Sequence, residues 1–503
     1  MRGLQVVAAA WLAVAGMATA GLAIDFSQPE PGEELPGGDA THAKAINRDV
    51  FSQSSANMSF AKELEFKVGN GFFRRQWVTA PASTKASDGL GPLFNSRACQ
   101  NCHLKDGRGH PPAKGEEAQS MFLRLSIPPQ TEEQKQLIAA GRGSIIPEPT
   151  YGTQLQNFAI AGEGRMVITY KEQPMQLADG VKVSLRAPAY TITDLGYGPM
   201  HPQTMTSPRV APPMIGLGLL EAIPEEAILA RADPDDKDGD GISGRPNYVR
   251  SLETEKVALG RFGWKAGSPT VRQQSADAFN GDIGLSSPLV PANSGDCTPA
   301  QAACLAAPHG GDPHYGGFEV PDAVLNLVSF YSRNLAVPKR RDAADPQVLH
   351  GRKMFHEAGC ASCHTPSFTT GKRDDLLEQS GQLIWPYTDL LLHDMGPGLA
   401  DGRPESVATG TEWKTPPLWG IGLTQIVSGH TQLLHDGRAR NVLEAILWHG
   451  GEAQAARDKV AAMRRSDREA LLRFVNSLRR RENAALDRCA GALAASIRGR
   501  RGA

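Results

Sequence analysis

The sequence has no excess of charge of either sign, few cysteines and few long apolar runs, and each shortage argues against a class of protein. Its 503 residues carry 53 Lys and Arg against 54 Asp and Glu, a formal net charge of −1. This argues against binding to nucleic acid through bulk positive charge. Seven cysteines are too few for a disulfide scaffold. A composition that is 40% hydrophobic and 21% charged instead indicates a folded chain.

The N-terminus has the pattern of a secretory signal. Arg2 precedes an apolar stretch from Leu4 to Ala15, and residues 18–20 and 21–23 both offer small–x–small cleavage sites. We therefore predict a signal peptide over residues 1–23 and export to the periplasm. The alternative is an uncleaved anchor, although the stretch is weakly apolar for that role. No later run approaches the roughly 18 apolar residues of a membrane span, so the chain is not expected to span a membrane after cleavage.

Four cysteines belong to two C-x-x-C-H motifs, the attachment pattern of a c-type haem. The two thiols each add to a haem vinyl group, and the following histidine is the axial ligand of the iron. A zinc site would need a second ligand pair nearby, and the motifs are far apart in the sequence. We therefore predict two covalent haems, haem 1 and haem 2. Haem 1 is attached through Cys99 and Cys102 and has His103 as its axial ligand. Haem 2 is attached through Cys360 and Cys363 and has His364 as its axial ligand.

The remaining three cysteines do not follow this pattern. Cys297 and Cys304 lie in a loop rich in Gly, Pro and Ala with no adjacent histidine, which predicts a short disulfide. Cys489 lies in the basic C-terminal tail, where it is either a free thiol or part of an intermolecular bridge.

The two halves of the chain repeat one order of motifs. A phenylalanine, Phe94 or Phe355, stands five residues before each C-x-x-C-H motif. Each motif is followed by a Pro-Pro-x-x-Gly-x-Gly-Leu segment and then by apolar residues at helical spacing. These segments cover residues 212–219 and 320–335 in the first half, and 416–423 and 467–478 in the second.

From this repeat we predict a mainly α fold with two tandem cytochrome c-like domains. The first covers residues 24–338, the second covers residues 346–480, and a basic tail covers 481–503. The first domain is longer, and alternating apolar residues around an Asp-Gly pair in residues 175–185 predict that it is enlarged by a small β-hairpin as well as by long loops.

The sixth ligand of each iron decides function, because a ligand on both sides makes an electron relay and an open side lets a small molecule react. Aligning residues 226–231 with 444–449 places Arg231 where the second half has His449. Arginine stays protonated and cannot bind iron. We therefore predict that His449 completes haem 2, that haem 1 lacks this ligand, and that Arg231 is a catalytic residue polarising a bound peroxide. Rival ligands are His435 and Met395 for haem 2, and His110, Met200, His201, Met205 and Met214 for haem 1.

An acidic loop follows Arg231 in the sequence. Asp236, Asp238, Asp240 and Gly241 match the first, third, fifth and sixth positions of a calcium-binding loop. Position twelve is Asn247 rather than a bidentate Glu, so the loop is incomplete. The alternatives are a calcium site with a further ligand from elsewhere and a solvated Asp/Gly turn.

Longer motifs carry a resemblance to a known family. The sequence resembles dihaem oxidoreductases, described as peroxidases or thiol oxidoreductases, which are akin to bacterial dihaem cytochrome c peroxidases and to the dihaem enzymes that mature tryptophan-derived quinone cofactors. The resemblance rests on residues 207–223, 238–245, 260–266, 391–396 and 434–453.

The resemblance implies an N-terminal haem that meets peroxide, a C-terminal haem that supplies electrons, and calcium between the domains. The segment 443–449 is similar to the one that carries a Met ligand in the peroxidases and a Tyr ligand in the quinone-maturing enzymes. This chain departs from both with His449. Met ligation raises a haem potential, so histidine is expected to lower it.

We therefore expect a periplasmic, peroxidase-like dihaem oxidoreductase. Haem 1 would reduce a small-molecule oxidant such as hydrogen peroxide, and haem 2 would relay electrons from a small redox protein, with calcium as a further cofactor. The alternatives are a dihaem cytochrome c that only transfers electrons, and a dihaem enzyme that oxidises thiols or proteins.

Overall fold

The structure is a computed structural model that describes residues 24–159 and 163–478. Cys489 and the proposed signal peptide lie outside these residues. The described part contains thirteen α-helices: α1 (Phe60–Phe73), α2 (Cys99–Cys102), α3 (Glu132–Ala139), α4 (Leu217–Glu221), α5 (Glu225–Leu229), α6 (Val271–Ile283), α7 (Ala302–Leu305), α8 (Asp322–Arg333), α9 (Pro346–Ala358), α10 (Thr424–Ser428), α11 (Val442–Leu447), α12 (Gln454–Ala462) and α13 (Arg465–Ser477). None of the described helices is long and apolar enough to cross a membrane.

The strands form antiparallel two-stranded sheets. They are β1 (Met121–Ser126) with β4 (Met205–Val210), β2 (Arg165–Gln176) with β3 (Lys182–Thr193), β5 (Tyr248–Arg250) with β6 (Val257–Leu259), β7 (Phe368–Thr369) with β8 (Leu383–Ile384), and β9 (Leu392–Asp394) with β10 (Glu412–Lys414).

The mainly α prediction is wrong, because the structure is 30% helix and 15% strand. Two features account for the strand content. The hairpin around Asp179 is present, but each of its strands has twelve residues. The other strands have six residues or fewer and most pair segments well apart in the sequence, as β1 does with β4 in the register Met121↔Val210. Such short pairings leave little periodic signal in a single sequence.

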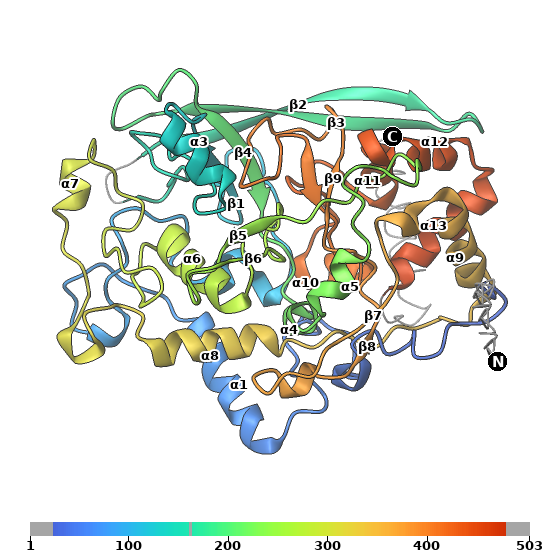
Figure 1. The fold of residues 1–503 in the computed structure, drawn as a ribbon, viewed down its shortest axis with the longest axis horizontal. Helices are drawn as coiled ribbons and strands as arrows, with labels where there is room; N and C mark the ends of the chain where they lie inside the picture. Colours follow the sequence, from blue (N-terminus) through green and yellow to red (C-terminus); the bar gives the residue numbers. More distant parts are fainter. Residues whose placement is uncertain (1–23, 160–162, 479–503) are drawn as a thin grey trace, which may run out of the picture.

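The hairpin β2–β3 extends across the top of the molecule toward α11 and α12 (Figure 1). Although it belongs to the first half of the chain, it packs on the second. The Tyr190 hydroxyl donates to Asp436 at 2.9 Å, and Arg468 pairs with Asp179 at the hairpin turn at 2.5 Å. Leu177 and Leu185 of the hairpin share an apolar core with Trp413 and other residues of the second half.

Each half contains one close crossing of two helices, and the two crossings are alike. In α1, a Cβ on Gly69 would collide with the Leu327 carbonyl of α8, so only glycine permits this approach. In α9, a Cβ on Gly351 would collide with the Ala470 carbonyl of α13 in the same way. The amphipathic helices predicted over residues 320–335 and 467–478 are confirmed, as α8 and α13.

The aromatic residues at the two crossings also correspond. Phe73 stands four residues after Gly69 and packs 5.2 Å from Tyr331, as measured between ring centroids. Phe355 stands four residues after Gly351 and packs 5.3 Å from Phe474. The structural counterpart of Phe355 is thus Phe73, not the Phe94 that sequence spacing indicates.

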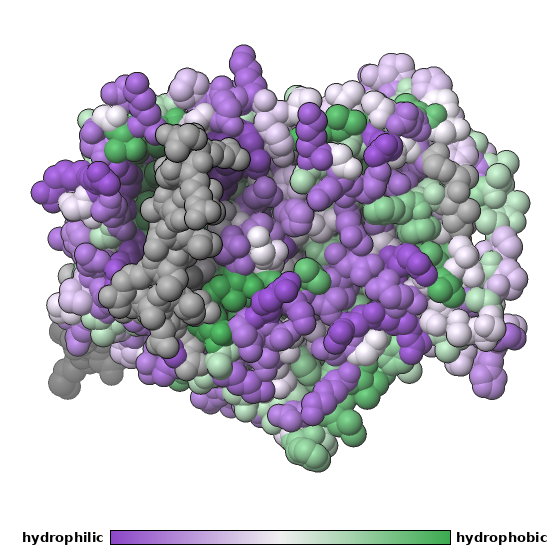
Figure 2. Space-filling view, turned by 180° about the vertical axis from the view of Figure 1, so that it is seen from behind, coloured by the Kyte–Doolittle hydropathy of each residue, from purple (hydrophilic) through white to green (hydrophobic). Residues whose placement is uncertain are grey.

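The halves are not separate in space. An apolar core containing Phe51, Ile215 and Leu219 also contains Trp419 and Leu423 from the second half. Near the N-terminus, the buried Glu33 pairs with Arg340 and Arg352, and the Pro36 carbonyl accepts from the Trp385 amide at 2.8 Å. Residues near 33–36 therefore pack on the second half, although the predicted boundary places them in the first. Seen from behind, the molecule has a surface that is largely hydrophilic with local hydrophobic patches (Figure 2).

Candidate functional site

The second C-x-x-C-H motif follows directly from the end of α9. Gly359 ends this helix with a φ of +93°, a conformation that favours glycine, and Cys360 begins a short 3₁₀ turn. His364 Nδ1 donates to the Tyr387 carbonyl at 2.9 Å, which leaves Nε2 as the basic nitrogen for a metal. Burial lowers the pKa of His364 to about 4, so its imidazole is neutral at pH 7, as an iron ligand must be.

The first motif is arranged in the same way. Cys99 and Cys102 form the short helix α2, and His103 Nδ1 donates to the Pro212 carbonyl at 2.9 Å. Burial also lowers the pKa of His103 to about 4. The Phe73 ring lies 6.3 Å from the His103 ring, and the Phe355 ring lies 6.4 Å from the His364 ring. The two halves thus present their histidines to a ligand with the same orientation and the same aromatic neighbour.

A cavity of about 470 Å³ surrounds the second motif. Its wall includes Cys360, Cys363, His364 and His449. His449 follows α11 and its Nδ1 donates to the Ala445 carbonyl at 2.7 Å, so its Nε2 is also basic. Burial lowers the pKa of His449 as well. The structure therefore brings His449 to the same cavity as His364, which is the arrangement that two axial ligands of one iron require.

The cavity wall fits a haem with its two carboxylate side chains. Arg108 Nε, His435 Nε2 and Trp419 Nε1 are buried on this wall and have no hydrogen-bond partner among the described residues. Buried polar atoms are rarely left unpaired. Lys414 also lines the cavity, and burial lowers the pKa of its ammonium to about 8. Carboxylates of a bound haem would supply acceptors for such groups.

The two rival ligands of haem 2, Met395 and His435, line the same cavity. The His435 ring stacks on Trp413 at 3.8 Å between centroids with an interplanar angle of 11°. Burial lowers the pKa of His435 to about 3, which keeps the imidazole neutral. Its stacked position makes it part of the cavity wall, whereas His449 and His364 each have a backbone carbonyl that orients the ring.

His393 lies within residues 391–396, one of the segments that resemble the family, but the segment alone does not indicate what this residue does. It is buried, its Nε2 lies 2.7 Å from Asp389 Oδ2, and its Nδ1 lies 2.7 Å from Glu452 Oε2. Burial alone lowers the pKa of His393, but the hydrogen bonds to these carboxylates outweigh it and raise the pKa well above its usual value. Its Nδ1 also lies 3.5 Å from Cys363 Sγ, so a positive charge is fixed beside the haem 2 attachment. No sequence signal links Asp389 and His393 to Glu452.

The first motif reaches the cavity of the second through Arg108. The Arg108 amide donates to Ser428 Oγ at 3.0 Å, and its carbonyl accepts from His430 Nε2 at 3.0 Å. The guanidinium donates to the Leu434 carbonyl and lies 5.1 Å from the Trp264 ring centroid. Both Arg108 and Pro212, the carbonyl partner of His103, line the cavity. The two motifs are thus connected through one cavity wall.

Arg231, predicted as a catalytic residue, is exposed just after α5 and is not among the residues that line the cavity. The structure gives no contact that would direct its guanidinium to a haem. Of the rival ligands for haem 1, Met214 packs in the same apolar cluster as Cys99. The others lie elsewhere: His110 is exposed beside His430, Met200 packs in another cluster, His201 follows it, and Met205 begins β4.

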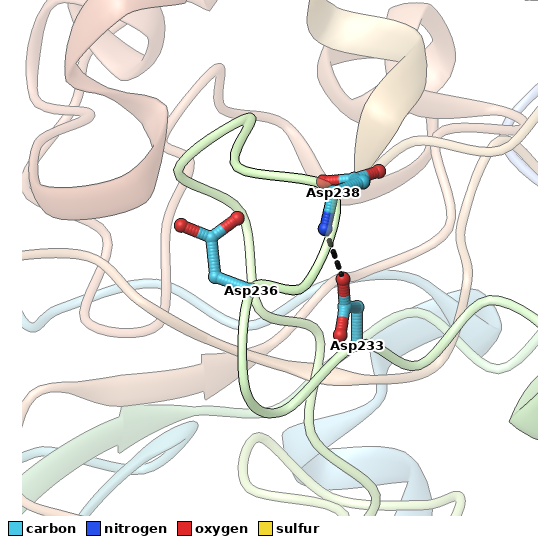
Figure 3. Close-up of side chains that lie close together, drawn as sticks. All are labelled: Asp233, Asp236 and Asp238. Atoms are coloured by element: carbon cyan, nitrogen blue, oxygen red, sulfur yellow. Dashed lines mark hydrogen bonds between the residues drawn. The ribbon is translucent and has the colours of Figure 1, made fainter.

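The acidic loop gathers a different set of carboxylates from the predicted one. Asp236 and Asp238 lie with Asp233, each offering an oxygen within 4.8 Å of the others (Figure 3). Asp240 is not in this group, and its carboxylate accepts from the Ile242 amide at 2.8 Å. Asn247, at position twelve, is buried and donates to the Lys265 carbonyl instead.

The disulfide prediction is confirmed, because Cys297 and Cys304 are bonded to each other. The four motif cysteines are free thiols in the polypeptide and are thus available for attachment.

Comparison with known families supports this reading of the motifs. The family model described as "Di-haem oxidoreductase, putative peroxidase" matches residues 33–478, which is most of the chain. No curated protein matches the chain.

Proposed function

The chain belongs to this family of di-haem oxidoreductases, and from that premise we propose that it is a periplasmic c-type dihaem peroxidase. Haem 1 would reduce a small oxidant such as hydrogen peroxide, and haem 2 would relay electrons to it from a small redox protein. One observation carries the proposal. The two motif histidines have matching environments, but His449 joins His364 on one cavity while its aligned counterpart, Arg231, is exposed.

The chain's own residues would hold each haem in a defined orientation. The four motif cysteines attach the vinyl groups, and the carbonyls of Pro212 and Tyr387 fix the tautomer of His103 and His364. The bound haems supply one-electron redox chemistry and an iron that can bind an oxidant. At the second site, His449 would occupy the remaining iron position and exclude substrate, so that site would only relay electrons.

The contacts between the motifs support electron transfer between the sites. Arg108 and Pro212 belong to the first site, and both line the cavity of the second. Apolar and aromatic residues, including Trp264 and Trp413, form much of this wall. Electrons passing between the two sites would therefore travel through packed side chains.

Calcium remains a prediction for the acidic loop. The Ser243 hydroxyl, at the end of the loop, donates to Glu452 at 2.6 Å, and Glu452 also contacts His393 beside haem 2. A cation in the loop would thus act close to the second site.

The proposal is tested by spectroscopy of the purified holoprotein. We expect one high-spin haem that responds to cyanide and hydrogen peroxide, together with one low-spin haem. Two low-spin haems that do not respond to peroxide would instead indicate an electron carrier. Loss of free thiol from a dithiol substrate would indicate the thiol-oxidising alternative.

A further inference from the structure

The two helix crossings differ by one buried hydroxyl. At the first crossing Tyr331 packs on Phe73, and at the second Phe474 packs on Phe355. A hydroxyl is therefore not needed for the crossing itself. Tyr331 is fully buried, and its hydroxyl donates to Asp106 Oδ1 at 2.8 Å. Asp106 is also buried. The hydrogen bond between them makes burial of this phenol and carboxylate tolerable. Because the second crossing lacks such a pair, helix packing does not account for its presence at the first.

Tyr331 lies close to the first haem motif. Asp106 stands three residues after His103, and its amide donates to the His103 carbonyl at 2.8 Å. The Phe73 ring lies between the two sites, 5.2 Å from the Tyr331 ring and 6.3 Å from the His103 ring. Tyr331 also packs in the apolar cluster that includes Cys99. A continuous set of packed side chains therefore joins the phenol to the haem 1 attachment.

The carboxylate partner distinguishes Tyr331 from the other tyrosines. Three of the eight tyrosines donate their hydroxyl to a carboxylate: Tyr190 to Asp436, Tyr331 to Asp106, and Tyr387 to Glu33.

Two of these carboxylates are held by arginines. Glu33 pairs with Arg340 and Arg352, and Asp436 pairs with Arg438 at 2.8 Å. Such ion pairs favour the charged carboxylate and make it a weak proton acceptor. Asp106 accepts from the Ser52 and Tyr331 hydroxyls and forms no ion pair within the described part of the chain. Its carboxylate is the one best placed to take a phenolic proton.

Two tryptophans on the cavity wall, Trp264 and Trp413, are poor alternatives for oxidation. The Lys265 ammonium lies 4.7 Å from the Trp413 ring centroid, and the Arg108 guanidinium lies 5.1 Å from the Trp264 ring centroid. A positive charge on either indole would be repelled by these cations. Both indole N–H groups donate to backbone carbonyls, at 2.9 Å for Trp413 and 2.8 Å for Trp264, and a carbonyl does not accept the proton of an oxidised indole.

We infer that Tyr331 is a redox-active tyrosine that serves the haem 1 site, an inference that rests on the proposed peroxidase function. Peroxide acting at haem 1 is the oxidant. Tyr331 loses one electron to that site and its phenolic proton passes to Asp106, which leaves a neutral tyrosyl radical and a carboxylic acid. Tyr331 thereby supplies one of the two electrons that reduce peroxide to water, and the bound haems would supply the other. An electron arriving through haem 2, together with return of the proton from Asp106, restores the phenol.

The experiment is electron paramagnetic resonance of the oxidised holoprotein, frozen soon after mixing with one equivalent of hydrogen peroxide. We expect an organic radical signal whose hyperfine structure narrows when the protein contains ring-deuterated tyrosine. Tyr331→Phe should lose the signal, and Asp106→Asn should reduce it. Tyr190→Phe is the matched control that should retain it. The Tyr331→Phe variant is expected to fold because Phe474 occupies the corresponding position in the second half.

The outcomes separate this inference from the proposed function. A peroxide-induced change in the haem absorption spectrum with no radical, or with a radical that survives in Tyr331→Phe, overturns the role of Tyr331 and leaves the peroxidase proposal standing. Absence of any spectral response to peroxide overturns both. Should Tyr331→Phe not fold, the radical signal of Asp106→Asn decides the matter, since a reduced signal supports the inference and an unchanged signal contradicts it.

Discussion

At the crossing of α1 with α8 the chain carries Tyr331 hydrogen-bonded to Asp106, and at the crossing of α9 with α13 it carries Phe474. At the position predicted to supply the sixth iron ligand, it is the second half that has the polar group at the site: His449 lines the haem cavity, whereas its counterpart Arg231 in the first half is exposed. The two motif histidines thus have similar surroundings, but the side chains at these two further positions differ. The comparison teaches that the helix packing beside the two haem motifs is alike, while single side chains around the motifs differ. These differences underlie the proposed division into a reacting site and a relaying site.

The largest expected effect comes from removing each haem in turn. Cys99→Ser with Cys102→Ser should halve the covalent haem content and abolish the spectral response to peroxide, since the reacting site is lost. Cys360→Ser with Cys363→Ser should also halve the haem content but leave the peroxide response. Pyridine haemochrome assays and absorption spectra measure both. Cys297→Ser with Cys304→Ser is the control and should retain both haems; an identical peroxide response in the two haem variants would contradict the division of roles.

Replacing His449 would make the two sites alike. His449→Ala should convert haem 2 from low spin to high spin, because its second nitrogen ligand is lost. Resonance Raman or magnetic circular dichroism spectra measure the spin state. His350→Ala is a suitable control, since His350 is a partly exposed histidine paired with Asp467. An unchanged low-spin haem 2 would assign the ligand to His435 or Met395 instead.

Acid should destabilise the cavity wall of the second half through His435. Burial lowers its pKa from 6.5 to about 3, so between these values the unfolded chain binds more protons than the folded one, and stability falls as pH falls. The loss is up to about 5 kcal/mol at pH 3. Denaturant unfolding at pH 7 and pH 4 should show a smaller pH-dependent loss in His435→Phe than in wild type. The exposed His110→Gln serves as control, and equal losses in His435→Phe and wild type would refute the assignment.

Alanine at either crossing glycine should separate the helices. Gly69→Ala and Gly351→Ala should each lower the free energy of unfolding by about 1–3 kcal/mol, because the added methyl meets a backbone carbonyl that has little room to move. Gly71→Ala in α1 is the matched control: its methyl would meet nothing within 4 Å, and it should raise stability by roughly 0.5–1 kcal/mol. A neutral Gly351→Ala beside a costly Gly69→Ala would show that the crossings are not equivalent.

The smallest expected effect concerns the acidic loop of the first half. If calcium binds there, Asp233→Asn should weaken binding more than Asp240→Asn, because the structure groups Asp233 with Asp236 and Asp238 (Figure 3). Isothermal titration calorimetry with calcium measures the difference. Weaker binding in Asp240→Asn than in Asp233→Asn would favour the loop geometry expected from the sequence, and no binding by the wild type would identify a solvated turn.

Several features were predictable because they depend on residues that are close together in the sequence. The C-x-x-C-H spacing alone predicts which residues would attach and ligate each haem, and the isolated pair Cys297 and Cys304 predicts its disulfide. The Asp-Gly turn predicts the hairpin, but its length and its position over the second half depend on contacts such as that of Tyr190 with Asp436. Such contacts join residues far apart in the sequence and leave no local pattern.

Other features depend on packing, which spacing along the sequence does not reveal. Phe94 matches Phe355 in distance from its motif, yet Phe73 takes the equivalent place because the chain between α1 and α2 is longer than the connection in the second half. Asp240 fits a calcium-loop template, but local hydrogen bonds turn its carboxylate toward Ile242. The contacts of His393 could not be inferred from its own segment, since its two carboxylate partners come from different segments.

The sequence by itself indicated the family, the two C-x-x-C-H motifs and the disulfide, because each depends on short motifs or on residues close together in the chain. Only the tertiary structure decided which side chains share a space: His449 with His364 on one cavity, Arg108 of the first half on the wall of the second site, and Tyr331 with Asp106 beside haem 1. The physical reason is that burial, hydrogen-bond partnering and electrostatic environment arise from segments brought together by folding, and these properties distinguish two sites that the motifs alone make identical.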